Sequence, residues 1–198
     1  MLTIIGLGPG DPDFLTLKAY RLLTSGKKIY LRTRKHPVVG FLENEGAVFA
    51  SYDDTYESAA DFDSVYATIA ADLIERLDEG DVIYAVPGNP FVAEESVALA
   101  IAMAKEKEIP VEVLYGASFI DAIVTATGED PVEGLSILDA FTTHAHRFSV
   151  VLPVTLDAER LAVVETILEQ HRPAHTLFEI CSVDTGMRVG SGLHVGLT

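Results

Sequence analysis

The residues of this chain best suited to chemistry lie in a glycine-rich segment near its start, Gly6-Leu7-Gly8-Pro9-Gly10-Asp11. The segment follows an apolar run, Leu2 to Ile5, and precedes a helical pattern, Leu15 to Ser25. A strand, a glycine-rich turn and a helix in this order expose backbone N–H groups to a ligand. The spacing is G-x-G-x-G-D rather than the G-x-G-x-x-G of dinucleotide sites, and the acidic residue that would bind the ribose is missing. The segment therefore predicts a ligand-binding loop of another kind.

Two further loops have a similar composition and the same expected place in the fold. Pro87-Gly88-Asn89-Pro90 follows the apolar run Asp81–Val86, and Gly116-Ala117-Ser118 follows the run Val111–Tyr115. Because parallel strands point their carboxyl ends to one edge of a sheet, the three loops are expected to line one site there. Glycine lets a ligand approach the backbone closely. An ordinary turn explains each loop taken alone, so the prediction depends on all three.

The elements that must position these loops alternate between strand and helix. The expected helices are Leu15–Ser25, Pro37–Asn44, Asp61–Glu79 and Phe91–Lys107. Each lies between short apolar runs that predict strands: Leu2–Leu7, Lys28–Arg32, Ala47–Ala50, Asp81–Val86 and Val111–Tyr115. This alternation predicts an α/β fold, a mainly parallel sheet flanked by helices.

Several segments carry a resemblance to a known family. GLGPGDPDFLTLKAYRLL, YLRTRKHPVV, DDTYES and GDVIYAVPGNPFVAEESV are similar to the tetrapyrrole (corrin/porphyrin) methylases, and the resemblance continues through GASFIDA and DPVEGLSILDA over residues 1–140. The segment LRTRKHPVV resembles the variant fused to MazG-type nucleotide pyrophosphohydrolases. The paired Glu and Asp residues of the pyrophosphohydrolase are absent, so pyrophosphohydrolase activity is not expected.

The resemblance implies a methyltransferase that holds S-adenosylmethionine in a cleft between two α/β domains. It implies that Asp11 faces the methyl acceptor, a small molecule of the tetrapyrrole kind, as the one candidate general base. A turn-stabilising role is the alternative for Asp11. The resemblance also suggests a homodimer. The residues it places beside the cofactor are Pro9, Gly88, Asn89, Pro90, Val92, Ser118 and Phe119.

Two positions depart from the family pattern, and one substitution tests the predicted site. Relatives commonly have Asp or His where this chain has Asn89, which keeps an acceptor but loses the charge. They commonly have Pro where this chain has Tyr115. Replacing Gly88 by Val is expected to block the cofactor and leave the fold intact, because the side chain would occupy the ligand's space.

The composition limits the partners. A net charge of −16 argues against binding to nucleic acid or to an anionic membrane surface. With 48% hydrophobic and 22% charged residues, the chain suits a packed globular protein. No apolar run approaches the roughly 20 residues that span a bilayer, and no basic segment precedes the first run. The single cysteine, Cys181, is expected to be a small buried apolar residue and fits a reducing compartment, so a cytoplasmic location is expected.

The composition shifts near residue 140. Residues 1–140 hold 10 Lys and Arg against 24 Asp and Glu, whereas residues 141–198 hold 4 against 6 and five of the six histidines. The later part, with RFSVVLP, HRPAHT and GMRVG, resembles a segment of phage-tail-like baseplate proteins. We therefore expect two domains, residues 1–140 and a small α+β segment over 141–198, joined as in a chimera. The expected elements of that segment are a strand Arg147–Pro153, a helix Asp157–Arg172, a strand His175–Cys181 and turns over Gly186–Gly196.

Other groups of side chains have alternative interpretations. A basic cluster beside the first loops either receives an anionic substrate or is a solvated face, and the polar residues after the third strand either line the cleft or form a turn. The pair Glu94-Glu95 is expected on a helix surface. Histidines 144, 146, 171 and 175 raise the question of zinc, but no cysteine or acidic partner has ligand spacing, so no metal is expected. The basic cluster is Lys27, Lys28, Arg32, Arg34 and Lys35, and the polar group is Tyr52, Asp53, Asp54 and Tyr56.

Three functions therefore stand as hypotheses. The first is an S-adenosylmethionine-dependent methyltransferase, in which most of the work is to position two reactants and exclude water. The second is a regulatory module that binds a small molecule without turnover. The third is a structural component of a phage-tail-like particle, which depends on residues 141–198 alone.

Overall fold

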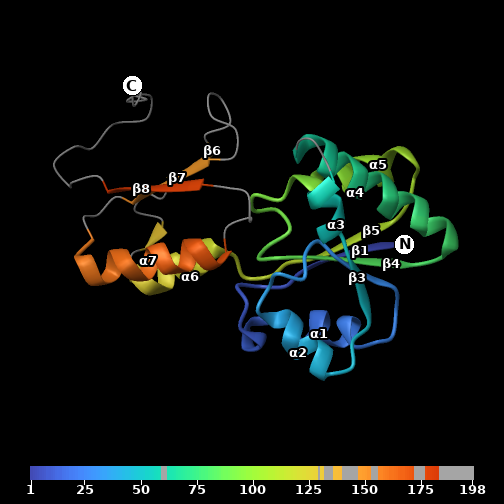
Figure 1. Ribbon diagram of the computed structural model, residues 1–198, viewed down its shortest axis with the longest axis horizontal. Coiled ribbons are helices and arrows are strands. Elements are labelled where there is room, and N and C mark those ends of the chain that lie inside the picture. The colour runs from blue at the N-terminus through green and yellow to red at the C-terminus, as the bar shows by residue number, and fades with distance from the viewer. Residues whose placement is uncertain are drawn as a thin grey trace. The chain divides into compact units, whose positions relative to one another are not determined.

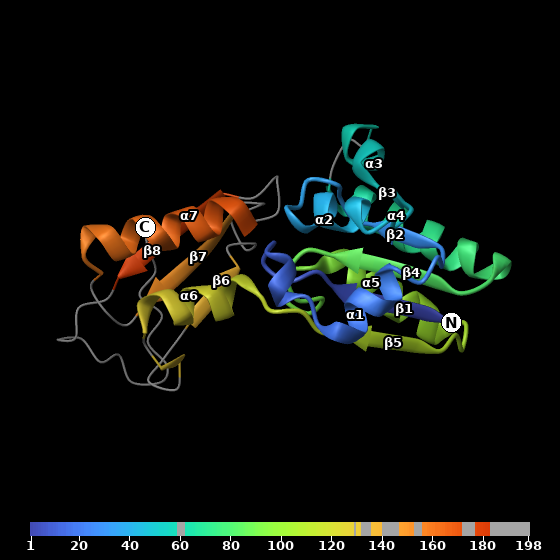
Figure 2. The same cartoon turned by 90° about the horizontal axis from the view of Figure 1, so that it is seen from below.

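The computed structural model describes residues 1–58, 62–128, 130–131, 136–139, 147–152, 156–171 and 177–182. The chain forms two compact units, Met1–Ser118 and Phe119–Thr198. The first unit contains a five-stranded sheet in the order β3-β2-β4-β1-β5, in which every pairing is parallel (Figure 2). Its strands are β1 (Leu2–Gly6), β2 (Ile29–Leu31), β3 (Phe49–Ser51), β4 (Val82–Val86) and β5 (Val111–Leu114). The predicted parallel α/β sheet is confirmed.

Helices cover both faces of this sheet. Figure 1 shows α1 (Leu17–Leu23) and α2 (Val38–Asn44) on one side, and α4 (Phe62–Arg76) and α5 (Glu95–Glu106) on the other. Thr16 begins α1, because its hydroxyl accepts a hydrogen bond from the backbone N–H of Ala19 at 3.2 Å. A short helix, α3 (Asp53–Ser58), follows β3, and single 3-10 turns lie at Pro12–Phe14 and Leu77–Glu79.

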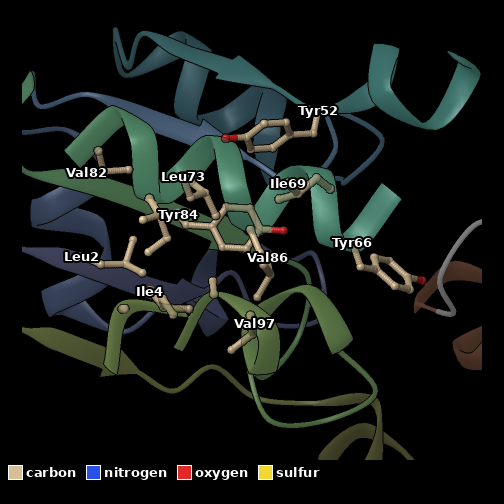
Figure 3. Packing of buried hydrophobic residues seen from close by; sticks show 14 of the residues in the cluster. Leu2, Ile4, Tyr52, Tyr66, Ile69, Leu73, Val82, Tyr84, Val86 and Val97 are labelled. Atoms are coloured by element: carbon tan, nitrogen blue, oxygen red, sulfur yellow. The ribbon is translucent and has the colours of Figure 1, made fainter. Parts of the chain in front are cut away.

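The strands are apolar at successive positions because both faces are buried. In β4 the side chains of Val82, Tyr84 and Val86 pack toward α4 and α5, while those of Ile83 and Ala85 pack toward α1 and α2. Figure 3 shows Tyr84 among Ile69 and Leu73 of α4. This two-sided core holds the carboxyl ends of the strands at one edge.

The second unit has its own sheet and core. Its elements are α6 (Phe119–Thr127), β6 (Ser136–Asp139), β7 (Arg147–Leu152), α7 (Ala158–His171) and β8 (Leu177–Ser182). The strand order is β6-β7-β8, with β6 and β7 antiparallel and β7 and β8 parallel. The helices α6 and α7 lie side by side (Figure 2). The buried core residues are Ile123, Val150, Val164 and Leu168.

The two compact units divide before α6, between Ser118 and Phe119. Ile123 of α6 is buried with Val150 of β7 and Val164 of α7, and Phe119 packs against the same cluster. The helix therefore contributes to the second core, although its sequence lies within the part that carries the clearest methylase motifs.

Three elements in the described residues were not expected, and the helix α5 begins four residues later than expected. The helices α3 and α6 and the strand β6 lack a prediction, and in α3 the sequence DDTYES has no apolar stripe. The helix α5 begins at Glu95 rather than Phe91, because Ala93 has a positive φ of 54° that no right-handed helix contains. The expected turns over residues 186–196 lie outside the described residues.

Candidate functional site

Three loops meet at the carboxyl edge of the first sheet, as predicted. Gly8 and Gly88 exchange two backbone hydrogen bonds, with N···O distances of 3.2 and 2.9 Å, which join the loop after β1 to the loop after β4. The carbonyl oxygen of Gly88 also lies against Gly6 and Gly116: a Cβ atom on Gly6 would be 2.5 Å from it, and one on Gly116 would overlap it. The backbones of all three loops are therefore in direct contact.

The glycines at this edge have two different roles. Gly6 and Gly116 have no room for a side chain, because the neighbouring backbone fills the space. Gly88 is different, since a Cβ atom there would have its nearest contacts with the third loop at 3.9 Å (Ser118 Cα) and 4.0 Å (Ala117 O). Its φ of +63° also favours glycine. Gly88 is thus the one of these three glycines that has room for a Cβ atom.

The second loop, residues 87–93, is ordered by its own hydrogen bonds. The side-chain oxygen of Asn89 accepts from the backbone N–H of Phe91 at 3.0 Å, and its carbonyl accepts from the N–H of Val92 at 3.0 Å. Pro90 is buried, whereas Asn89 and Val92 are half-buried. The expected acceptor of Asn89 is therefore engaged within the loop, and the group that remains for a ligand is its amide N–H₂, a donor.

The other predicted contact residues lie at or beside the same edge. Pro9 is half-buried, and Asp11 is exposed and accepts a hydrogen bond from the backbone N–H of Asp13 at 3.0 Å, as a cap of the 3-10 turn. The turn-stabilising alternative for Asp11 is confirmed, while its role as a base stays a prediction. Ser118 is buried at the end of the first unit. Phe119 begins α6 and packs in the second core, so its predicted contact with a cofactor also stays a prediction.

A buried ion pair lies behind the second loop. Arg32 Nη1 donates to Glu94 Oε2 at 2.7 Å, and the side chains are only 7% and 2% exposed. Ser96 Oγ donates to the other carboxylate oxygen at 2.7 Å, and Tyr84 and Ser96 share a further bond of 2.7 Å. Since Ser96 has one proton and gives it to Glu94, Tyr84 must be the donor to Ser96. Arg32 Nε donates to the hydroxyl of Tyr56 at 2.8 Å.

The electrostatics of this cluster keep both charges in place. Burial alone would lower the pKa of the Arg32 guanidinium, but the Glu94 carboxylate together with the hydroxyls of Tyr56 and Tyr84 outweighs this effect and raises the pKa. Burial raises the pKa of the Tyr84 hydroxyl well above its usual value. The expectation that Glu94 lies on a helix surface is wrong, whereas Glu95 is exposed. Sequence reasoning missed the buried role of Glu94, which stands directly before α5, because its partner Arg32 lies 62 residues away in the sequence.

The segment that contains Arg32 also supports the first loop. His36 is buried, and its Nε2 lies 3.1 Å from the carbonyl oxygen of Gly8. Because a carbonyl only accepts, Nε2 carries the proton in this contact. Pro37 packs on the same loop, since a Cβ atom on Gly10 would lie 3.0 Å from its ring. Residues 32–37 therefore support the first two loops through contacts with Gly8, Gly10 and Glu94.

The basic cluster does not form one anion-binding surface. Three of its five members are in ion pairs: Arg32 with Glu94, Lys28 with Glu79 at 3.0 Å, and Arg34 with Glu43 at 3.0 Å. Arg34 also donates to the carbonyl of Phe49 and stacks on its ring, 4.8 Å from the centroid. The solvated or structural alternative is thus the better description.

The polar residues after β3 connect elements of the fold. Thr33 Oγ1 donates to Asp53 at 2.6 Å and the backbone N–H of Arg34 donates to it at 2.8 Å. Burial by itself would raise the pKa of the Asp53 carboxyl, but these two hydrogen bonds, a further one from Ser51 and the charge of Lys35 together outweigh it, so the pKa is lowered. Tyr52 donates to Asp72 of α4 at 2.6 Å. These contacts give Tyr52 and Asp53 structural roles.

Asp53→Asn is expected to make the stability of the first unit less dependent on acid pH. Because the folded pKa of Asp53 lies below its unfolded value of about 3.9, its contribution is present above that value and is lost as the pH falls through the folded pKa. Urea unfolding followed by tyrosine fluorescence measures this unit alone, since all seven tyrosines lie before residue 119. The exposed Asp78→Asn is the control, and a profile of Asp53→Asn parallel to the wild type from about pH 6 to about pH 3 would contradict the role.

Comparison with protein families now identifies the fold. Residues 1–180 match the tetrapyrrole (corrin/porphyrin) methylases. The chain belongs to the tetrapyrrole methylase family. The match continues beyond the composition shift near residue 140 and includes the described elements of the second unit up to Ile180 of β8. The family relation thus extends over a part of the chain for which we expected a different origin.

Two proteins that are similar to this chain match it over only part of their own length. YabN, an uncharacterized protein of Bacillus subtilis (strain 168), is 42% identical over 144 residues, which are 73% of this chain and 29% of YabN. Diphthine methyl ester synthase of Dictyostelium discoideum is 33% identical over 126 residues, 62% of this chain and 44% of that protein. The chain therefore spans less than half the length of these relatives.

A solved structure supports the fold of this tetrapyrrole methylase family member. Uroporphyrin-III-C-methyltransferase from Thermus thermophilus superposes with a TM-score of 0.50 at 24% identity, over 68% of this chain and 56% of that chain.

Among the described residues, no group of three or more His, Cys, Asp or Glu side chains is placed to hold a metal ion. His144, His146 and His175 lie outside those residues. No helix in the described ranges has the length and apolar character needed to cross a membrane.

Proposed function

We propose that this chain binds S-adenosylmethionine at the carboxyl edge of its five-stranded sheet and transfers the methyl group to an acceptor. The observation that carries the proposal is the contact between three loops at that edge, made by the Gly8–Gly88 hydrogen bonds and by the fit of Gly6 and Gly116 around the Gly88 carbonyl. Ligands of open α/β sheets bind outside the carboxyl ends of the strands. Membership of the tetrapyrrole methylase family supports the choice of cofactor.

The residues at this edge fit the cofactor. The backbone of Gly88 leaves room for a group that a side chain there would displace. The amide N–H₂ of Asn89, which has no partner among the described residues, is a donor that suits the carboxylate of the methionine part, and the backbone of Ser118 bounds the space above Gly88. When bound, S-adenosylmethionine supplies a methyl group on a positively charged sulfur. The chain's own task is to orient the two reactants and exclude water, which needs no protein nucleophile.

The acceptor decides whether Asp11 is needed. One relative is named a diphthine methyl ester synthase and a structural neighbour a uroporphyrin-III-C-methyltransferase, so the acceptor class is a protein side chain or a tetrapyrrole. A carboxylate that becomes a methyl ester is already deprotonated and needs no base. A carbon acceptor must lose a proton, and the exposed Asp11 on the first loop is placed to accept it.

Titration calorimetry with S-adenosylmethionine and S-adenosylhomocysteine tests the proposal. We expect one site in the wild type and an affinity at least about tenfold lower in Gly88→Val, because the side chain enters the space of the ligand. Gly46→Val is the matched control. Gly46 also has a positive φ, +79°, and open surroundings, but it lies before β3, at the amino edge of the sheet. Both variants should lose about 1–2 kcal/mol of stability from the strained φ.

Two results would contradict parts of the proposal. No heat of binding from folded wild-type protein would exclude the cofactor, and equal loss of affinity in both variants would exclude Gly88 from the site. Transfer of a labelled methyl group to a tetrapyrrole or peptide acceptor separates a methyltransferase from a regulatory module that binds without turnover. Fusion to a MazG-type domain, the homodimer, and the baseplate and chimeric origin of residues 141–198 stay predictions.

A further inference from the structure

The second loop is held at both of its ends by one chain of hydrogen bonds. Tyr84 lies in β4, the strand that precedes this loop (residues 87–93), whereas Glu94 and Ser96 follow the loop. Tyr84 donates to Ser96 at 2.7 Å, and Ser96 donates to Glu94 at 2.7 Å. These side chains are buried, so water does not compete for the bonds. The start and the end of the loop are thereby tied to each other.

Arg32 fixes this chain to the sheet. Its backbone N–H donates to the carbonyl of Ala85 in β4 at 2.9 Å, and its guanidinium donates to Glu94 at 2.7 Å. A second donor of the guanidinium, Nε, bonds the hydroxyl of Tyr56, which prevents rotation about the ion pair. The position of Glu94 is therefore set by a neighbouring strand and not by the loop itself.

The loop ends in a strained residue that these contacts hold in place. Ala93 has a φ of 54°, in the left-handed region that a residue with a Cβ atom rarely adopts. Such a conformation persists where the surrounding structure determines it, and it is found at ligand-binding segments. Glu94, the next residue, is the buried end of the hydrogen-bond chain, so its contacts oppose the relaxation of Ala93.

We propose that Arg32, Tyr84, Glu94 and Ser96 form a clamp that holds the second loop in its ligand-ready conformation, which makes them positioning residues. The identity of the ligand rests on the proposed function, whereas the order of the loop can be measured by hydrogen exchange without any ligand. A loop that is already ordered loses less conformational freedom on binding, so the clamp raises affinity without touching the ligand.

Two substitutions weaken the clamp in different ways. Ser96→Ala removes both hydrogen bonds of the serine and leaves Tyr84 without its acceptor. Tyr84→Phe removes only the hydroxyl that donates to Ser96 and keeps the bonds of Arg32 and Ser96 to Glu94. In both variants we expect faster hydrogen exchange at the N–H groups of Gly88, Phe91 and Val92. We also expect S-adenosylmethionine to bind about tenfold more weakly.

The chain offers a matched control for the tyrosine substitution. Tyr52 is also buried and donates to Asp72 of α4 at 2.6 Å, so Tyr52→Phe makes the same chemical change outside the clamp. It should alter neither loop exchange nor affinity. A merely structural role of the clamp would lower the melting temperature of Ser96→Ala and leave the affinity of the folded protein unchanged.

The outcomes separate the two proposals. If the wild type binds and both Ser96→Ala and Tyr84→Phe match it in exchange and in affinity, the clamp is overturned and the proposed function stands. Faster exchange with unchanged affinity also overturns the positioning role. If the wild type binds no S-adenosylmethionine but exchange at the loop increases in the variants, the proposed function fails and the clamp stands as a device that orders the loop. If Ser96→Ala does not fold, Tyr84→Phe decides.

Discussion

Gly116→Ala is expected to destabilise the first unit by about 3 kcal/mol. The added Cβ atom would overlap the carbonyl oxygen of Gly88 and lie 2.8 Å from the carbonyl carbon and oxygen of Gly6. All of these atoms belong to the backbone at the ends of three adjacent strands, so no side-chain rotation relieves the overlap. The strands must move apart, and the two hydrogen bonds between Gly8 and Gly88 would be strained or lost.

Gly40→Ala is the matched control for this prediction. Gly40 is exposed within α2 and has no positive φ, and a Cβ atom added there would have no neighbouring atom within 4 Å. Alanine is favoured over glycine inside a helix by about 0.5–1 kcal/mol, so this variant should be as stable as the wild type or more stable. Urea unfolding followed by tyrosine fluorescence reports on the first unit, which holds all seven tyrosines. Equal midpoints for Gly116→Ala and Gly40→Ala would disprove the close packing of the loops.

Arg32→Met is expected to cost about 3–5 kcal/mol, because it leaves the Glu94 carboxylate buried without its counter-charge. Glu94→Gln should also destabilise, since it leaves the guanidinium uncompensated. Glutamine still reaches both neighbours: its oxygen can accept from Arg32 while its N–H₂ donates to Ser96, which then donates to Tyr84. The shape of the cluster is therefore kept, and the loss measures the removed charge together with the Tyr84 O–H, which then has no acceptor among the described residues.

The double variant Arg32→Met with Glu94→Gln makes the test specific. No bare charge remains in it, so it should be at least as stable as either single variant, and the two losses should not add. The same tyrosine signal measures the free energy of unfolding of all four proteins. Simple additivity would show that the two side chains do not depend on each other. The surface pair of Lys28 and Glu79 is the control, and removing Lys28 should change stability little because both partners are exposed.

The first unit was predictable in outline because its signals are local. Short apolar runs separated by helical stripes indicated all five strands of the parallel sheet, and their observed bounds differ by one or two residues. Parallel strands share a carboxyl edge by geometry, so the meeting of the loops at Gly8, Gly88 and Gly116 followed from the order of elements alone. The polar helix α3 was missed because it carries no apolar stripe, whereas α6 does have apolar residues at helical spacing, Phe119, Ile123 and Val124, that could have predicted it.

The sequence by itself determined the class of fold and the edge of the sheet at which the three glycine-containing loops meet, since these depend on periodicity and chain direction. Only the tertiary structure decided which of these glycines has room for a Cβ atom, which atom of Asn89 is engaged within the loop, and that Glu94 is buried with Arg32. It also decided that α6 belongs to the second core. The physical reason is that these properties arise between residues distant along the chain, where packing and desolvation, rather than local pattern, select the partner.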